Sequence, residues 1–120
     1  MFVSLTDTPA FALAPGATAR ALFGDRAMLN VVELEPGATV APHQHPHEQL
    51  GLILRGSMTM TIGAEEREIR EQDAYVAPPG VRHGGTAGPD GAVVLDVFAP
   101  VREDYRAAAD AAEAAEAAGA

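Results

Sequence analysis

Cysteine is absent from this chain of 120 residues. A disulfide framework and any thiolate chemistry are therefore excluded. If the protein binds a metal ion, the ligands have to be histidine, carboxylate, amide or water, because the softest protein ligand is missing.

Positive charge is scarce as well. The chain has 8 Lys and Arg residues against 17 Asp and Glu residues, which gives a formal net charge of −9. A field of this sign repels nucleic acid and anionic membrane surfaces, so we expect neither as a partner. The overall composition, 48% hydrophobic and 21% charged, is typical of a globular protein.

Long apolar runs are also missing. No stretch approaches the roughly 20 residues that a membrane-spanning helix needs. Residues 1–14 lack the basic start and continuous apolar run of a secretion signal, so a cytoplasmic location is the default expectation. The length suits one domain over residues 1–120, with a barrel at about 18–101 and an Ala-rich helix or tail at about 102–120.

What the chain does have is a series of short apolar segments separated by Gly and Pro. Turn signals lie at residues 15–16, 36–37, 78–80 and 88–91. Strand-like segments lie between them, at residues 26–35, 49–54, 57–62 and 92–98. Many short strands at regular spacing predict an all-β sandwich or barrel.

The C-terminal segment differs from the rest. Residues 102–120 are dominated by Ala, with Asp110, Glu113 and Glu116 spaced three residues apart. This composition predicts a helix, and the acidic residues share a face that we expect to be solvated.

All four histidines fall in two short places. His43, His45 and His47 form a cluster, and His83 stands well apart from it. In a strand, His43 and His45 point to one face, and two imidazoles at that spacing can chelate one divalent ion. A third ligand then has to come from another strand, where His83 is the only distant imidazole. The alternative is that these are ordinary exposed loop histidines beside prolines.

Two segments resemble the two motifs of the cupin family. Residues 37–56 match the first motif, Gly, five residues, His-x-His, three or four residues, Glu, six residues and Gly, if Gln49 takes the Glu position. Residues 72–83 match the second motif through Pro78, Gly80 and His83. Gln72 stands where the family usually has Gly, and Ala87 where it often has Asn. The resemblance covers roughly residues 33–101.

This resemblance implies an all-β fold, the cupin double-stranded β-helix (jelly-roll) barrel, with a short C-terminal helix. It also implies one divalent metal ion, Zn, Ni, Fe, Mn or Co, held by His43, His45, Gln49 and His83. A competing register makes Glu48 the ligand and turns Gln49 outward. We take His47 to be a rim residue, because it follows Pro46 at an expected turn.

Asp96 and Arg102 are further candidates. Asp96 interrupts an apolar strand and shares a face with Val94 and Phe98, so it is either buried and functional or solvated on the outer face. A buried Asp96 would act as a general acid or base. Arg102 follows the last strand, where it can hold a substrate carboxylate with two prongs or form a salt bridge with Glu103 or Asp104. Arg55 and Arg82 are weaker candidates.

The histidine motif together with residues 95–105 is similar to one cupin subfamily, the pectin degradation proteins. That similarity implies a metal-dependent enzyme that converts cyclic 4,5-unsaturated monouronates to the linear keto form. A small sugar acid is then the substrate; Asp96 and Arg102 are the catalytic residues, and Phe98 and Arg102 bind the substrate. The alternatives are a cupin dioxygenase, a polyketide cyclase and a non-catalytic module that binds a sugar acid or a metal.

Small cupins commonly pair, so the resemblance also implies a homodimer. Val3, Leu5, Leu22 and Phe23 are candidate interface residues, and the alternative is that they belong to the core. Pairing is one way to cover an exposed strand edge.

Overall fold

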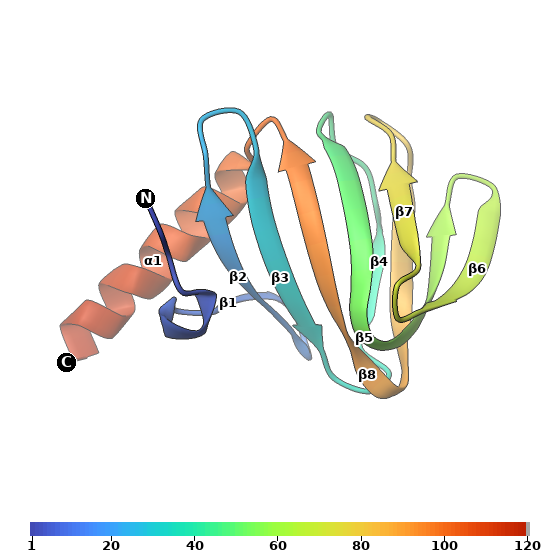
Figure 1. Cartoon of the computed structure of the whole chain (residues 1–120), viewed down its shortest axis with the longest axis horizontal. Helices are drawn as coiled ribbons and strands as arrows, with labels where there is room; N and C mark the ends of the chain where they lie inside the picture. Colours follow the sequence, from blue (N-terminus) through green and yellow to red (C-terminus); the bar gives the residue numbers. More distant parts are fainter. Residues whose placement is uncertain (120) are drawn as a thin grey trace.

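The computed structural model describes residues 1–119, a series of antiparallel strands that ends in one helix (Figure 1). The elements in chain order are the 3-10 turn η1 (Leu5–Asp7), β1 (Phe11–Ala14), β2 (Ala17–Phe23), β3 (Met28–Leu34), β4 (Thr39–His43), β5 (Glu48–Ile62), β6 (Glu65–Arg70), β7 (Ala74–Ala77), β8 (His83–Ala99) and α1 (Glu103–Gly119).

Two long strands, β5 and β8, build both layers of the fold. Residues 92–98 of β8 pair with β3 on one side and with the first half of β5 on the other. Residues 83–86 of β8 pair with β4 and with the second half of β5. The front layer therefore runs β1-β2-β3-β8-β5-β7 and the back layer β4-β8-β5-β6. This arrangement confirms the expected all-β jelly roll with a C-terminal helix.

The jelly roll is open rather than a closed barrel. The strand order begins at β1 and ends at β6, and within residues 1–119 these two strands do not pair with each other. Each layer therefore keeps free edges, and the expected barrel is incomplete.

Both long strands bend at the places where the Gly and Pro signals predicted that strands would end. Residues 49–54 and 57–62 belong to one strand, and the expected turn at residues 88–91 lies inside β8. Gly56 and Gly91 adopt φ values of +77° and +75° beside each other at this bend. Glycine permits these angles, so the turn residues redirect the strands from one layer to the other without ending them.

The core lies between the layers, and the side chains that form it alternate along each strand with a period of two residues. In β3, Met28, Asn30, Val32 and Leu34 are buried, whereas the residues between them face outward. Ile53 and Phe98 are the largest apolar side chains with almost no exposure. Alternation of this kind is what a sheet with one buried face requires.

Helix α1 covers the end of the front layer beside β1 and β2 (Figure 1). Ala109 is buried there, and the ring of Tyr105 lies 5.8 Å from that of Phe11. Asp110 is exposed, as predicted for the acidic face. Ala120, the last residue of the predicted segment, lies outside the described residues. None of the described helical residues forms a helix long and apolar enough to cross a membrane.

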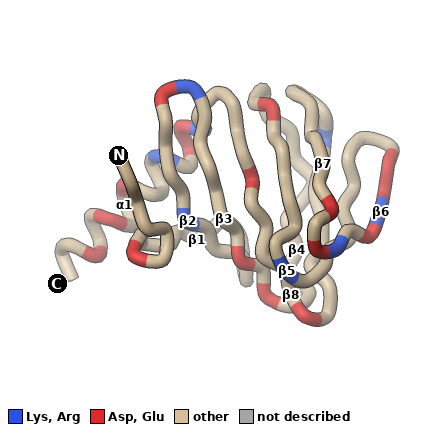
Figure 2. The backbone as a smooth tube through the Cα atoms, viewed as in Figure 1, with Lys and Arg blue, Asp and Glu red and all other residues tan. Residues whose placement is uncertain are grey.

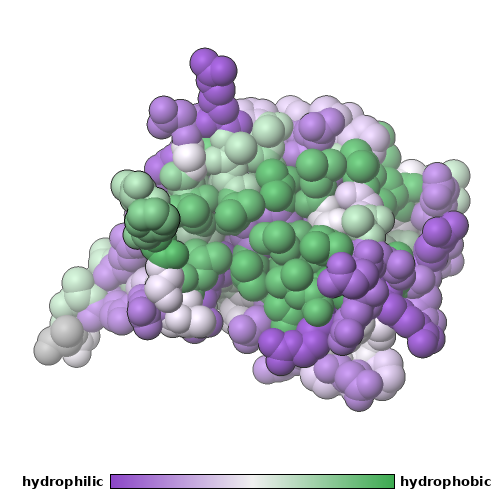
Figure 3. Space-filling view, in the orientation of Figure 1, coloured by the Kyte–Doolittle hydropathy of each residue, from purple (hydrophilic) through white to green (hydrophobic). Residues whose placement is uncertain are grey.

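The outer face of the front layer is apolar. One register row crosses five strands through Leu22, Leu29, Val97, Leu50 and Val76. The corresponding surface is largely hydrophobic in Figure 3, and Figure 2 shows charges at the strand ends, on β6 and along α1.

Only one of the four candidate interface residues belongs to that face. Leu22 lies in the register row, whereas Phe23 points to the inner side and packs against the core. Val3 and Leu5 lie before β1, in and beside η1.

Candidate metal centre

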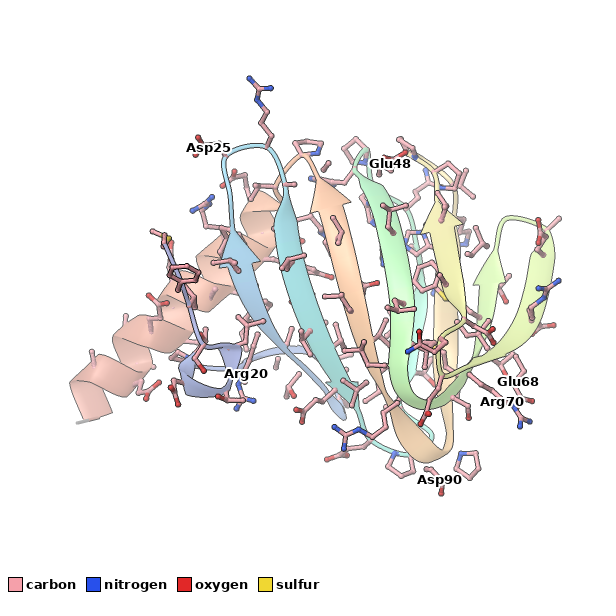
Figure 4. All side chains as sticks on the ribbon, viewed as in Figure 1. Arg20, Asp25, Glu48, Glu68, Arg70 and Asp90 are labelled. Atoms are coloured by element: carbon pink, nitrogen blue, oxygen red, sulfur yellow. The ribbon has the colours of Figure 1, made fainter. Side chains whose placement is uncertain are left out.

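Three histidines meet at one end of the jelly roll. His43 ends β4 and pairs in register with His83, the first residue of β8, while His45 lies in the loop between β4 and β5. Their potential ligand atoms all lie within 4.8 Å of one another. Figure 4 shows Glu48 at this end and Asp90 at the opposite end of the molecule.

Each of the three imidazoles is oriented by its own backbone. The Nδ1 atoms of His43, His45 and His83 lie 2.9, 3.1 and 2.9 Å from the carbonyl oxygen of a residue two positions away. A carbonyl oxygen only accepts, so each Nδ1 carries the proton and donates it. The Nε2 lone pairs are thereby left free, which is the arrangement typical of metal-bound histidine.

Gln49 completes the group from β5. Its side chain is buried, and its Oε1 lies 3.1 Å from Nε2 of His45 and 2.9 Å from Nε2 of His83. Three lone pairs thus face one another at hydrogen-bond distance, and a cation between them relieves their repulsion. The donor set of imidazole nitrogen and amide oxygen fits a divalent metal ion. The neighbouring Glu48 is exposed, so the structure turns Gln49 inward and Glu48 outward.

Burial favours the neutral form of two of these histidines. It lowers the pKa of His45, with a further contribution from the positive charge of Arg102. It also lowers the pKa of His83. A neutral imidazole is the form that binds a metal, because the ligand nitrogen has to be deprotonated.

Asp96 lies in the interior, on the same face of β8 as Phe98. Burial raises the pKa of Asp96 to about 6, against the opposing effects of the hydrogen bonds from Tyr75 and Gln49 and the charge of Arg102. The Tyr75 hydroxyl donates to Oδ1 of Asp96. Of the two alternatives for Asp96, a buried or a solvated carboxylate, the structure therefore shows the buried one.

Arg102 is buried and partly paired. Its Nε and Nη2 lie 3.2 and 2.8 Å from the carboxylate oxygens of Asp104, so the salt bridge is formed. Its guanidinium carbon lies 3.8 Å from the ring centre of Tyr105 and 5.2 Å from that of Phe98. Nη1 is buried and has no hydrogen-bond partner in the part of the chain that the structure describes. Asp104 takes one N–H of Nε and one of Nη2, so the two N–H groups of Nη1 remain for a ligand.

One cavity joins the candidate residues. It measures about 50 Å³, and six of the residues that line it are His43, Gln49, His83, Asp96, Phe98 and Arg102. His45 does not line it, although the ring of Phe98 meets the His45 ring edge-on at 5.7 Å. Larger hollows of about 400 and 320 Å³ open elsewhere on the surface, and none of these six residues lines them.

The remaining basic and histidine candidates stay outside this cavity. His47 packs against the ring of His45 at 5.3 Å but is not part of the three-histidine group. Arg55 and Arg82 are both exposed.

Three polar residues of the site were missed from the sequence. Tyr75 and Tyr105 line the cavity. Nothing in the sequence marks Tyr75, and Tyr105 ends the segment that resembles the subfamily but was given no role. Asn30 lies opposite Asp96 in register, is fully buried, and its amide atoms find no partner within residues 1–119. A polar residue at a core position of an apolar strand, the signal that singled out Asp96, also marks Asn30.

Both the sequence and the fold of this chain are similar to those of known proteins. A family model described as "Cupin domain" matches residues 30–98. The pectin degradation protein KdgF of Dickeya dadantii (strain 3937) is 33% identical over 84 residues, which is 69% of this chain and 76% of that protein.

Two solved structures are similar over most of the chain. The structure of KdgF from Halomonas sp. superposes with a TM-score of 0.82 at 29% identity, covering 88% of this chain and 97% of that one. The polyketide cyclase RemF from Streptomyces resistomycificus gives a TM-score of 0.74 at 28% identity, covering 85% and 80%.

Proposed function

Because this chain belongs to the cupin domain family, with relatives of the KdgF type, we propose that it is a metal-dependent enzyme that opens cyclic 4,5-unsaturated monouronates from pectin or alginate breakdown to the linear keto form. The observation that carries the proposal is the shared cavity. Three of the four proposed metal ligands, the buried carboxylate of Asp96 and Arg102, whose Nη1 has no partner within residues 1–119, line the same small space.

The proposed metal ligands are His43, His45, Gln49 and His83. Three imidazoles and an amide suit Zn, Ni, Fe, Mn or Co, and because the amide is neutral the site carries one negative charge less than a site with Glu. When bound, the ion supplies Lewis-acid polarisation of substrate oxygens.

The proposed substrate contacts come from the end of β8 and the start of α1. Arg102 lines the cavity, and its Nη1, which has no hydrogen-bond partner within residues 1–119, is suited to a uronate carboxylate. Phe98, with almost no exposure, presents an apolar wall to the sugar ring. Asp104 holds the other side of the guanidinium, so Arg102 is already oriented before a ligand arrives.

Asp96 is the proposed proton carrier. Removal of the proton of the C1 hydroxyl lets a C1=O bond form as the bond between C1 and the ring oxygen breaks, giving an aldehyde at C1 and an enolate at C5. Return of a proton to C4 then gives the C5 ketone. One proton leaves and one is returned, so a single carboxylate is sufficient and no oxidant or reductant is needed.

The test is turnover of 4,5-unsaturated galacturonate, followed by the loss of its ultraviolet enol-ether absorbance and by NMR of the linear product. Asp96→Ala should lower turnover by about 10²–10⁴-fold while metal content is unchanged. Asp90→Ala is the matched control, because Asp90 is an exposed carboxylate on the same strand at the opposite end of the molecule (Figure 4). Full activity in the Asp96→Ala variant would remove Asp96 from the mechanism.

The same assay separates the other functions. Metal binding and uronate binding with no acceleration over the spontaneous reaction would indicate a non-catalytic module. Oxygen uptake with an aromatic substrate would indicate a dioxygenase.

A polyketide cyclase is the second candidate, favoured by the similarity to RemF. A cyclase of this kind needs an apolar pocket for several rings, and pockets for drug-sized ligands measure about 300–1,000 Å³. The cavity here is about 50 Å³, which suits the reacting end of a small molecule. Binding of a multi-ring polyketide in preference to the uronate would reverse this choice.

A further inference from the structure

We propose that Tyr75 is a positioning residue that sets the direction of the Gln49 amide, so that the amide oxygen and not the amide nitrogen faces the metal. The inference rests on the proposed metal site and adds to it a residue outside the ligand set. It is carried by the hydrogen bonds of Tyr75 and by the space that Gly51 leaves for its ring.

The Tyr75 hydroxyl has a single proton, and Asp96 receives it. The hydroxyl oxygen therefore presents its lone pairs to Gln49, whose Nε2 lies 3.2 Å away and donates to it. The two contacts fix each other, because a hydroxyl that donates to a carboxylate can only accept from its other neighbour.

The consequence for Gln49 is a fixed polarity. With Nε2 donating to Tyr75, Oε1 is left on the side of His45 and His83. A flipped amide would place its NH₂ group there, and that group has no lone pair for a metal. The amide thus needs an acceptor on the side away from the histidines to remain a ligand. Tyr75 supplies it at 3.2 Å, and the Asp96 carboxylate adds to the acceptors on that side.

Gly51 makes room for this arrangement. It lies between Tyr75 of β7 and Asp96 of β8 in the register of the front layer. A Cβ on Gly51 would lie 2.1 Å from Cζ of the Tyr75 ring, closer than any real contact. The ring therefore crosses β5 over the glycine and brings its hydroxyl to both partners.

The first test is the affinity for Co²⁺, measured by the visible absorption of the bound ion and by calorimetry. Tyr75→Phe keeps the ring and removes the hydroxyl, and we expect it to weaken binding about 10–100-fold, the usual effect of losing a partner of a metal ligand. Thr59→Val is the control, because it removes a hydroxyl from an exposed position of β5 that does not line the cavity. It should leave the affinity unchanged.

A double variant separates orientation from a general structural effect. Gln49→Glu offers two equivalent oxygens, so a carboxylate has no wrong direction. In that background Tyr75→Phe should cost no Co²⁺ affinity. An equal loss in both backgrounds would overturn the proposal, because it would mean that Tyr75 supports the fold and not the amide.

A third variant tests the space instead of the hydroxyl. Gly51→Ala leaves Tyr75 chemically intact but displaces its ring, and we expect it to weaken Co²⁺ binding in the same direction. Circular dichroism and the unfolding midpoint show which variants are folded, and only Tyr75→Phe needs to fold for the inference to be decided.

The outcomes keep the two proposals apart. If the unaltered protein binds no Co²⁺, or binds it as well after His83→Ala, the metal site itself is wrong. If His83→Ala abolishes binding and Tyr75→Phe binds like the unaltered protein, the site stands and the role of Tyr75 is wrong.

Discussion

Gln72 carries backbone strain. Among the described residues it is the only one other than glycine with a positive φ, at 71°. It is also one of the positions at which the chain departs from the cupin motifs, because the family usually has Gly there. Left-handed backbone costs a residue with a side chain roughly 1–2 kcal/mol. The departure from glycine therefore lowers the stability of the fold, and it leaves the lining of the cavity unchanged because Gln72 is not part of it.

We expect Gln72→Gly to stabilise the protein. Relief of the left-handed strain is partly offset by the greater freedom of glycine in the unfolded chain, so the gain in the free energy of unfolding should be about 0.5–1 kcal/mol. Thermal unfolding should show the midpoint rising by about 3 °C.

Gly37→Ala is the opposite control for Gln72→Gly. Gly37 has φ +73°, and a Cβ there would meet nothing within 4 Å, so only backbone strain is added. This variant should lose about 1 kcal/mol. A neutral result for both variants would show that left-handed residues are not strained in this fold.

Asp104 should contribute a pH-dependent part of the stability. Its hydrogen bond to Arg102 lowers the pKa of Asp104 below 3.8, despite an opposing effect of burial. A carboxyl with a lowered pKa in the folded protein stabilises it above the unfolded pKa, and that contribution is lost as the pH falls through the folded pKa. Its side chain is 62% exposed, so the contribution is at most about 1 kcal/mol after solvent screening.

Urea unfolding of Asp104→Asn should therefore show a small loss of stability at neutral pH and none well below the usual pKa of Asp. Glu103→Gln is the neighbouring control. Glu103 meets Arg106 at 3.6 Å with 78% of its side chain exposed, so its loss should change the free energy of unfolding less. A loss that persists unchanged in acid would mean that packing, not charge, explains the Asp104 variant.

Residue types at fixed spacing were the part of the site that the sequence could predict. The residues that the motifs implied as ligands are brought together, namely His43, His45, Gln49 and His83. Period two put Asp96 on one face with Val94 and Phe98 and left its burial open, and the structure buries that face. Tyr75 could not be found in this way, because its role depends on a glycine of the adjacent strand and a carboxylate of the strand beyond it. Such a contact exists only after three strands have taken their register.

The bend shared by β5 and β8 is the main difference between the predicted and observed elements. Gly and Pro signals are local, so they mark a change of direction but do not tell whether the hydrogen-bond ladder continues through it. Here the pairing of β5 with β8 resumes beyond the bend after a register shift, from Gly56 with Ala92 to Met58 with Ala87, and Gly56 and Gly91 lie in close contact at that point. The predicted short strands were therefore correct in position and wrong in number.

Gly56→Ala should be strongly destabilising. A Cβ at this position would lie 2.1 Å from the carbonyl oxygen of Gly91, which is backbone and cannot rotate away. Steric overlap adds to the cost of the left-handed backbone, so we expect a loss of about 3 kcal/mol.

Gly63→Ala is the control that separates the steric overlap at the bend from the cost of the left-handed backbone angle. Gly63 also has a positive φ, +58°, but a Cβ there would make only an ordinary contact, 3.5 Å from a methyl group of Val81. Urea unfolding should show a loss of about 1 kcal/mol. Equal losses for the Gly56 and Gly63 variants would mean that the bend tolerates a side chain.

At the scale of the whole molecule, the charge and the apolar face act in opposite directions. A net charge of −9 keeps copies of the chain apart, but few of the charged residues lie on the outer face of the front layer (Figure 2). In the two central register rows of that face, Arg20 is the single charged residue among the ten positions. Leu50 and Val76 are 44% and 51% exposed there. An apolar face with a charged border is typical of a surface that a partner covers.

We expect a second copy of the chain to cover this face. Five strands about 4.8 Å apart and about six residues long give an area of roughly 500 Å² for each copy. Two copies then bury about 1,000 Å², the lower limit for a specific dimer.

Leu50→Arg places a charge at the middle of the face, and sedimentation velocity should show it as a monomer under conditions in which the unaltered protein is a dimer. Thr59→Arg puts the same charge on an exposed position of the same strand in the back layer and should stay dimeric. Because each copy carries a charge of −9, added salt should strengthen the dimer by screening their repulsion. A dimer that survives Leu50→Arg but not Thr59→Arg would assign the interface to the back layer instead.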